Sequence, residues 1–300
     1  MTSLLEAEGL SKRYGRHRAL SDCDVSVPAG RVAGLVGPNG AGKTTLLQLA
    51  VGLLEPSAGT IRVLGRRPAE DAAELARVGF VAQETPTYPN LTVAQHLMMG
   101  EALNPSWDAS LAEARVGRLG LDVRQKARSL SGGQRAQLAL TLAVAKRPEL
   151  LILDEPVASL DPLARREFLQ GLMETVAEHH TGVVVSSHLI SDLERVCDYL
   201  VVLVDSRVVL AGDVAELLAG HHLLTGPRRD ISGLPANQTV IEESHTDRQT
   251  TVLVRGRGPI LDPAWTARPL SLEDLVLAYM RRGRAGTPGP SNRKGLEVVA

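Results

Sequence analysis

The sequence predicts an α/β fold whose sheet is largely parallel, followed by a smaller α+β segment. Three observations predict this class. Short apolar runs alternate with amphipathic helical patterns up to about residue 220. Within that stretch, residues 86–147 show helical patterns without a convincing strand, which indicates an inserted helical part. From about residue 221, glycine and proline interrupt the runs, and the character of the chain changes.

The elements of the first part follow from the spacing of apolar residues. Apolar runs predict strands at 31–36, 61–64, 78–82, 150–153, 183–185 and 200–204. Apolar residues at helical spacing predict helices at 43–53, 92–103, 108–119, 134–146, 163–179 and 189–197. This order is typical of strand-helix-strand units, which build parallel sheets.

A small extension is predicted over residues 221–283. We interpret residues 223–238 as a loop and 240–254 as two strands around a polar turn. Ser271 precedes Asp274 by three residues, which predicts the start of an amphipathic helix over 271–282. The composition of residues 284–300 predicts a flexible tail.

Composition excludes several classes of protein. The 300 residues include 33 Lys+Arg and 34 Asp+Glu, a formal net charge of −1, which argues against a nucleic acid as the main partner. No apolar run approaches the length needed to cross a bilayer, so we expect a soluble or peripheral chain without a secretory leader. Cys23 and Cys197 fit no metal or redox spacing and are expected to be reduced core residues.

A phosphate-binding loop is predicted at 37–44, GPNGAGKT, between a predicted strand and a predicted helix. Its glycines let successive backbone N–H groups face phosphate oxygens, and the helix N-terminus adds positive potential. Lys43 is expected to reach the β- and γ-phosphates, Thr44 to bind Mg²⁺ and Thr45 to approach the α-phosphate. The residues predicted to bind the nucleotide here are Gly37, Pro38, Asn39, Gly40, Ala41, Gly42, Lys43, Thr44 and Thr45.

Two carboxylates follow the apolar run at 150–153 in the sequence LLILDEP. Asp154 is predicted at the carboxyl end of a buried strand, where it would hold Mg²⁺ and face Thr44. Glu155 is expected to polarise the attacking water as a general base. Such pairs are common at solvated strand ends, but the phosphate loop favours the catalytic interpretation.

The sequence LSGGQ at 130–134 narrows the interpretation. Ser131 is predicted to cap a helix that starts at Gln134, with the intervening glycines leaving backbone N–H groups open to an anion. Together with the phosphate loop and the acidic strand end, this signature makes the chain resemble the ATP-binding cassette (ABC) family of ATPases. The resemblance covers about residues 4–220.

The resemblance implies a P-loop NTPase core with a mixed, largely parallel sheet, an N-terminal antiparallel β part and a helical subdomain at about 86–147. It implies that residues 1–220 form the ATPase domain. It also implies that Tyr14 stacks on adenine, and that Gln83 contacts Mg²⁺ and the attacking water. His188 would contact the γ-phosphate, so the implied catalytic residues are Glu155, His188 and Gln83.

The family also implies a second ABC subunit, paired head to tail, with a homodimer expected. ATP would lie between Lys43 of one subunit and the signature of the other. The implied partner-facing residues are Ser131, Gly132, Gly133, Gln134 and Asp161. Departures from the family pattern are Val157 after Pro156, Arg135 after Gln134 and Ser186 two residues before His188; none removes a ligand or the catalytic carboxylate.

The absence of a membrane-spanning run makes the chain similar to the separate ATP-binding subunit of a bacterial-type transporter. Such a subunit would lie in the cytoplasm on the inner face of the membrane, bound to a separate transmembrane permease. The short extension favours export over import. A cassette ATPase acting on ribosomes or DNA is the remaining alternative. Residues 84–97 would contact the permease, with Tyr88, Leu91 and Leu97 as apolar candidates for which a core role is equally open.

Overall fold

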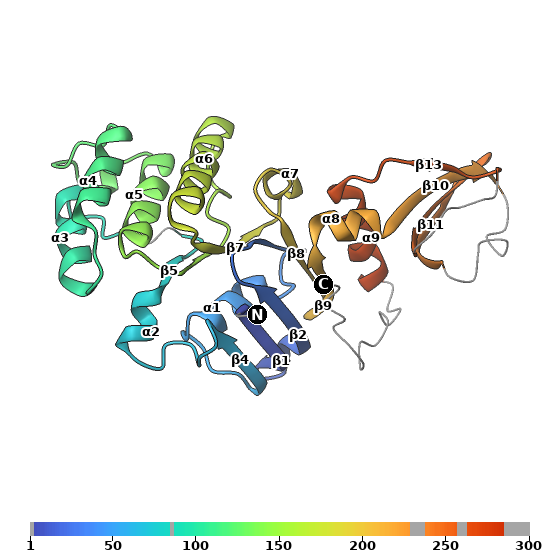
Figure 1. Cartoon of the computed structure of the whole chain (residues 1–300), viewed down its shortest axis with the longest axis horizontal. Coiled ribbons are helices and arrows are strands. Elements are labelled where there is room, and N and C mark those ends of the chain that lie inside the picture. Colours follow the sequence, from blue (N-terminus) through green and yellow to red (C-terminus); the bar gives the residue numbers. More distant parts are fainter. Residues whose placement is uncertain (1–2, 85–86, 229–237, 257–262, 285–300) are drawn as a thin grey trace. The chain divides into compact units, whose positions relative to one another are not determined.

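The computed structural model describes residues 3–84, 87–228, 238–256 and 263–284. Its chain divides into two compact units, Met1–Ala211 and Gly212–Ala300, called unit 1 and unit 2 below (Figure 1). This boundary lies ahead of residue 220, where the resemblance ends the ATPase domain. A search of the described helices found none with the length and apolar character that a membrane span requires.

In the described part of unit 1, a six-stranded sheet positions the predicted motifs. Its strand order is β5-β6-β7-β3-β8-β9. The neighbours from β5 to β8 pair in parallel, which confirms the predicted class. Its strands are β3 (Val32–Val36), β5 (Val78–Val81), β6 (Leu150–Leu153), β7 (Gly182–Ser187), β8 (Tyr199–Val204) and β9 (Arg207–Asp213). Strands β3, β6, β7 and β8 are buried along their whole length, as expected for a sheet covered on both faces.

A separate three-stranded antiparallel sheet has the order β2-β1-β4. Its strands are β1 (Ser3–Tyr14), β2 (His17–Pro28) and β4 (Ala58–Val63). The predicted strand at 61–64 therefore lies in this sheet and not in the parallel one. The reason is that β4 pairs with β1, from Leu5 opposite Val63 onward. This sheet is the antiparallel β part that the family resemblance implies.

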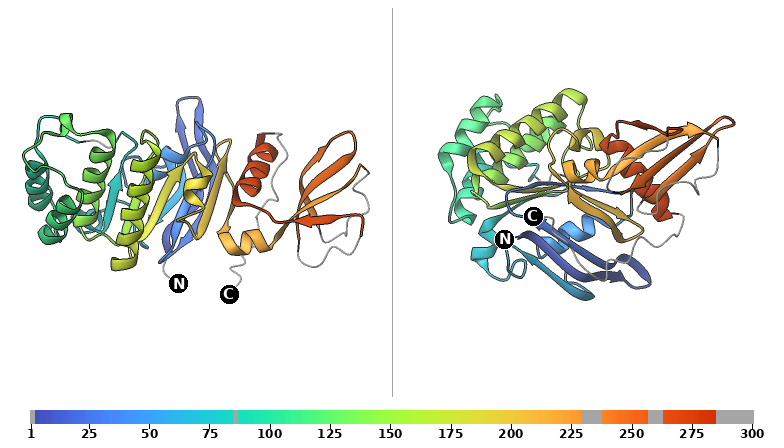
Figure 2. Two further views of the ribbon diagram at one scale, coloured as in Figure 1. Left: turned by 90° about the horizontal axis from the view of Figure 1, so that it is seen from above. Right: turned by 45° about the vertical axis from the view of Figure 1, so that its right-hand side comes forward.

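The helices of unit 1 overlap the six predicted ranges, and one further helix, at Ala72–Arg77, was not predicted. Helices α3, α4 and α5 and the 3₁₀ turn η1 gather at one side, away from the β2-β1-β4 sheet, and α6 lies beside α5 (Figures 1 and 2). Their apolar cluster includes Val93, Val116 and Leu138. The helices are α1 (Lys43–Ala50), α2 (Ala72–Arg77), α3 (Val93–Leu103), α4 (Ala109–Arg118), η1 (Ala127–Ser129), α5 (Gly132–Ala145), α6 (Pro162–His179) and α7 (Ile190–Leu193).

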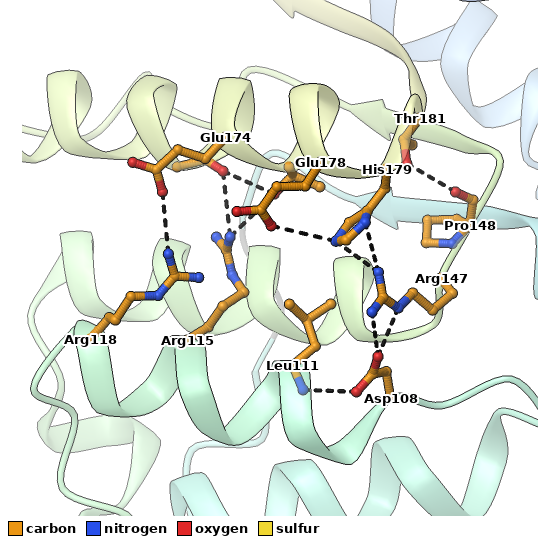
Figure 3. Close-up of polar contacts among 12 residues, drawn as sticks. Asp108, Leu111, Arg115, Arg118, Arg147, Pro148, Glu174, Glu178, His179 and Thr181 are labelled. Atoms are coloured by element: carbon orange, nitrogen blue, oxygen red, sulfur yellow. Dashed lines mark hydrogen bonds and ion pairs between the residues drawn. The ribbon is translucent and has the colours of Figure 1, made fainter.

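Arg147 ties three of these helices together at one end (Figure 3). It follows the C-terminus of α5, and its Nε donates to Oδ2 of Asp108, the N-cap of α4, at 2.8 Å. Its Nη1 lies 2.7 Å from Nδ1 of His179 in the last turn of α6. The N–H of Leu111 and the Arg147 guanidinium together hold the pKa of Asp108 below its usual value.

The described part of unit 2 contains a four-stranded antiparallel sheet in the order β11-β12-β10-β13. The predicted strand pair at 240–254 and the predicted helix at 271–282 are both found, and Ser271 and Asp274 cap that helix reciprocally. Its elements are α8 (Val214–Ala219), β10 (His221–Pro227), β11 (Thr239–His245), β12 (Gln249–Arg255), β13 (Thr266–Arg268) and α9 (Leu272–Arg284). The predicted tail, apart from Arg284, lies outside the described residues.

Three predicted elements were wrong in extent or type. The loop assigned from residue 223 begins instead with strand β10, which pairs along its length with β12. The helix predicted at 189–197 ends at Leu193, because the chain turns so that the Asp198 carboxylate can accept the N–H of Val32. The helix predicted at 43–53 ends at Ala50, since Gly52 takes a positive φ of 74°.

Candidate functional site

Four strands of the parallel sheet bring the predicted residues to one edge. The phosphate loop follows β3, Gln83 follows β5, Asp154 and Glu155 follow β6, and His188 follows β7. Parallel strands end at the same edge of a sheet, which is where ligands bind in open α/β folds. Residues far apart in the sequence, such as Asn39 and His188, which are 149 positions apart (188 − 39), therefore line one cavity.

The phosphate loop depends on glycine at specific positions. A Cβ at Gly37 would collide with the carbonyl oxygen of Leu203 on β8. Gly42 has a φ of 107°, and a Cβ there would collide with the carbonyl oxygen of Ala19. Only glycine lets the loop pass this close to its neighbours and enter α1 at Lys43.

Lys43 is buried, and its ammonium group is fully engaged by the loop and the acidic strand end. The Nζ donates to the carbonyl oxygen of Gly37 at 2.8 Å and to that of Pro38 at 3.4 Å. It also lies 3.3 Å from Oε1 of Glu155. The ammonium group thus lies where it would bind a phosphate. In this structure it is paired with the carboxylate of Glu155 instead.

Glu155 links the phosphate loop to the histidine after β7. Its Oε2 lies 2.9 Å from Nδ1 of His188, so its two oxygens contact two different cations or proton donors. The side chain is only 11% exposed. Its φ of 44° is left-handed, a conformation that costs energy for a residue other than glycine and that clusters at functional sites.

Asp154 lies deeper than Glu155. It is 1% exposed, and its Oδ1 accepts a hydrogen bond from the hydroxyl of Ser186 at 2.7 Å. Thr44 and Gln83 line the cavity above it. The three side chains offer hydroxyl, amide and carboxylate oxygens, which are the ligands that Mg²⁺ prefers.

A cavity of about 510 Å³ is lined by Lys43, Thr44, Gln83, Glu155 and His188, whereas Asp154 is not among its lining residues. It contains ten of the predicted residues and three that sequence reasoning missed, His17, Ala19 and Ala158. Of the three, only His17 could have been found from the sequence. The glycine in YGRH indicates a tight turn, and such a turn places His17 directly opposite Tyr14. The predicted residues are Tyr14, Asn39, Gly40, Gly42, Lys43, Thr44, Thr45, Gln83, Glu155 and His188.

Tyr14 is the aromatic residue of this cavity and is 46% exposed. The Nζ of Lys12 lies 5.4 Å from the centroid of its ring, a cation–π contact. Lys12 is itself anchored by donating to the carbonyl oxygen of Glu55 at 2.7 Å. The ring is therefore braced by a fixed cation while remaining accessible to a base.

The LSGGQ signature forms a second, separate helix start. Ser131 caps α5, as predicted, by accepting the N–H of Gln134 at 3.2 Å, and Gln134 returns the bond to the N–H of Ser131 at 2.9 Å. The helix begins at Gly132, two residues before the predicted Gln134. A Cβ at Gly133 would come within 2.9 Å of Ala164 Cβ on α6, so glycine allows close packing of the two helix starts.

Asp161 caps the neighbouring helix α6. Its Oδ1 accepts the N–H groups of Leu163 and Ala164, each at 3.0 Å. Neither Asp161 nor the signature residues line the cavity around Lys43. The two predicted groups of residues therefore do not share this cavity within one chain.

The three candidates for contact with a permease differ in exposure. Tyr88 is 60% exposed, and its N–H donates to Nε2 of the buried His96 at 3.0 Å. Leu97 packs against the apolar cluster of the helical part, so the core role applies to it. Leu91 is partly buried, and its carbonyl oxygen accepts the N–H of Ala127.

Comparison with known proteins gives consistent similarities. The ABC transporter family profile matches residues 20–158. A Nod factor export ATP-binding protein I of Cupriavidus pinatubonensis is 34% identical over 302 aligned residues, covering 94% of this chain and 92% of that protein. A sulfate/thiosulfate import ATP-binding protein of Synechococcus elongatus is 33% identical, covering 71% of this chain and 63% of that protein.

A solved structure described as the ATP binding subunit of an ABC transporter has the same fold. It superposes with a TM-score of 0.64 at 29% identity. The superposition covers 72% of this chain and 92% of that structure.

Proposed function

Since this chain belongs to the ABC transporter family, whose ATP-binding subunits hydrolyse ATP to power transport, we propose that it energises export through a separate transmembrane subunit. The observation that carries the proposal is the cavity in which Glu155 contacts both Lys43 and His188. It combines a lysine suited to bind phosphate, a carboxylate suited to act as a base, and a histidine that contacts this carboxylate, and this combination suits hydrolysis of a γ-phosphate.

In the proposed reaction, the γ-phosphate takes the place of the Glu155 carboxylate beside Lys43. Glu155 then accepts a proton from the attacking water, and His188 holds the carboxylate and the γ-phosphate in position. Thr44, Gln83 and Asp154 would hold Mg²⁺, which neutralises charge on the phosphate oxygens. Tyr14 stacks on the adenine ring and orients the nucleotide.

We further propose that two copies of the chain close head to tail around ATP. The separation of the signature from the cavity supports this, because Ser131 and Gly133 are then free to contact ATP bound to the partner. ATP would bridge two helix N-termini of positive potential, and its hydrolysis would remove the bridge. The complex would lie on the cytoplasmic face of the membrane against its permease.

Export is preferred over import because of how far each similarity extends. The match to the export protein covers 94% of this chain, whereas the match to the import protein covers 71%. A match that covers 94% of the chain must include most of unit 2 as well as unit 1. Unit 2 is the part that this chain has in addition to the cassette. Import is the second candidate, favoured by the 33% identity to the import protein.

Purification of the tagged chain from detergent-solubilised membranes tests the proposal. We expect a polytopic membrane protein to co-purify and to raise the rate of ATP hydrolysis. Recovery of ribosomes or DNA in its place would contradict a transport role.

A growth test distinguishes export from import. Cells that lack the chain should become sensitive to a compound that they normally expel. If they require a nutrient instead, that result would support import.

A further inference from the structure

Ser186 is one of the positions at which the sequence departs from the family pattern, and it lies at the centre of the site. It belongs to β7 and is fully buried. Strand β7 pairs in parallel with β6, with Val185 opposite Leu153. The register therefore places Ser186 beside Asp154 and Glu155, the two carboxylates that follow β6.

The Ser186 hydroxyl contacts both of these residues. It donates its proton to Oδ1 of Asp154 at 2.7 Å. It accepts the backbone N–H of Glu155 at 2.8 Å. The buried Ser186 hydroxyl thus donates to Asp154 and accepts from Glu155. Because the hydroxyl is fully buried, water does not compete for these hydrogen bonds.

The bond to Glu155 acts at a strained point of the backbone. With a φ of 44°, Glu155 is left-handed, and such a conformation persists only when the surrounding structure holds it. The Ser186 oxygen accepts a hydrogen bond from the N–H of Glu155, the backbone group next to the bond whose rotation is φ. This hydrogen bond fixes the position from which the Glu155 side chain extends. The two carboxylate oxygens of Glu155 then lie 3.3 Å from Nζ of Lys43 and 2.9 Å from Nδ1 of His188.

We propose that Ser186 is a positioning residue for ATP hydrolysis: its hydroxyl holds the backbone of Glu155 in the left-handed conformation and fixes the rotamer of Asp154 through Oδ1. This inference rests on the proposed role of Glu155 as the base. Ser186 itself does not touch the nucleotide. Its effect is on the placement of the carboxylates, so it governs turnover more than binding.

Replacement of the hydroxyl is tested with a matched control on the other end of the same strand. Thr181 precedes β7, is also buried, and donates its hydroxyl to the carbonyl oxygen of Pro148 at 3.2 Å (Figure 3). Thr181→Val removes a buried hydroxyl remote from the cavity. The comparison of Ser186→Ala with Thr181→Val therefore separates positioning from the general loss of a buried hydrogen bond.

We expect Ser186→Ala to lower kcat by about 10- to 100-fold, as a small misplacement of a catalytic group does. The Kd for ATP, measured on the same protein by equilibrium dialysis, should stay within about twofold of the wild type, because the phosphate loop is unchanged. Retained binding also shows that the variant is folded. Ser186→Thr keeps the hydroxyl and should restore kcat, while Thr181→Val should change neither quantity by more than about twofold.

A double-mutant cycle with Glu155→Gln shows whether Ser186 acts through Glu155. If it does, Ser186→Ala should cause no further loss of the residual turnover in the Glu155→Gln background. Full additivity of the two losses would overturn the inference, as would a kcat of Ser186→Ala equal to that of Thr181→Val. Substantial hydrolysis by Glu155→Gln alone would instead contradict the proposed base, so the two failures are distinguishable.

Discussion

Lys43 and Glu155 form an ion pair at the position proposed for the γ-phosphate. Both side chains are nearly buried, and their oppositely charged atoms are 3.3 Å apart. In the proposed reaction, the triphosphate brings negative charge to the same ammonium group and displaces the Glu155 carboxylate, which would then act as the base. Until then, the ion pair keeps the buried ammonium group from lacking a partner.

Tyr14 gives a prediction for the other end of the cavity. Its ring is accessible and braced by Lys12, so Tyr14→Ala should weaken ATP binding by about 1–3 kcal/mol, the contribution of one base–aromatic stack. The loss should be similar for GTP, since every base has a π-face. The measurement is the Kd of each nucleotide by fluorescence titration.

Tyr88→Ala is the matched control for that prediction. Tyr88 is also an exposed tyrosine, yet it does not line the cavity. Nucleotide affinity should be unchanged by it. An equal loss in both variants, or none in Tyr14→Ala, would contradict the stacking role.

Single residues were predictable from sequence where a motif specifies them. The residues that line the cavity from 37–45 and at Glu155 follow from spacing alone. The contacts of Ser186 with both carboxylate residues did not, because they depend on the register of two strands separated by 28 residues of the chain (154–181). His17 likewise enters the cavity through its pairing with Tyr14 and not through a motif.

At the scale of elements, the start of α5 yields a prediction about assembly. Ser131→Arg places a bulky cation where the partner's ATP is proposed to bind. ATP affinity of the single chain should be unchanged, but the ATP-dependent dimer should be lost. Sedimentation velocity in the Glu155→Gln background, where the dimer should persist, measures this.

A second capping box supplies the control for the Ser131 variant. Thr92 and Gln95 cap α3 with the same reciprocal bonds that Ser131 and Gln134 make. Thr92→Arg therefore costs a comparable amount of stability, about 1 kcal/mol, without touching the signature. Dimers that survive in Ser131→Arg, or that are lost equally in Thr92→Arg, would refute the composite site.

The junction of α4, α5 and α6 gives a prediction about pH. Asp108→Asn keeps the N-cap of α4 but removes the ion pair with Arg147, so at neutral pH it should cost up to about 1 kcal/mol. Because folding lowers the pKa of Asp108, its ionic contribution is present above the ordinary value of 3.8 and is lost as the pH falls through the lower folded pKa.

Urea unfolding of the wild type and of Asp108→Asn at a series of pH values checks this. The difference in free energy of unfolding should be largest near neutral pH and should shrink toward zero at strongly acidic pH. A difference that grows on acidification would show that the carboxylate is not held in its ionised form.

Strand β10 was mispredicted as a loop because tertiary packing determines its structure. Strand β10 contains Gly226 and ends at Pro227, residues that normally break a strand. Gly226 is accommodated because Trp265 lies against it, where a Cβ would meet the ring at 3.0 Å. Such tertiary packing overrides local composition and is invisible to a reading of adjacent residues.

At the scale of the whole molecule, two compact units are joined in one chain. Unit 1 carries every residue of the cavity and both helix starts of the proposed partner contact. Unit 2 has its own apolar cluster, which includes Leu224, Val252 and Trp265. We therefore assign hydrolysis to unit 1. Because unit 2 has an apolar core of its own, its sequence can change without altering the residues of the cavity.

The proposed mechanism depends on Glu155 acting as the base for ATP hydrolysis in a dimer closed around ATP. The most direct test is phosphate release by Glu155→Gln, measured beside its sedimentation with and without ATP. We expect turnover to fall by at least about 100-fold while ATP binding persists and a stable ATP-dependent dimer forms. Hydrolysis near the wild-type rate, or a chain that stays monomeric with bound ATP, would contradict the account.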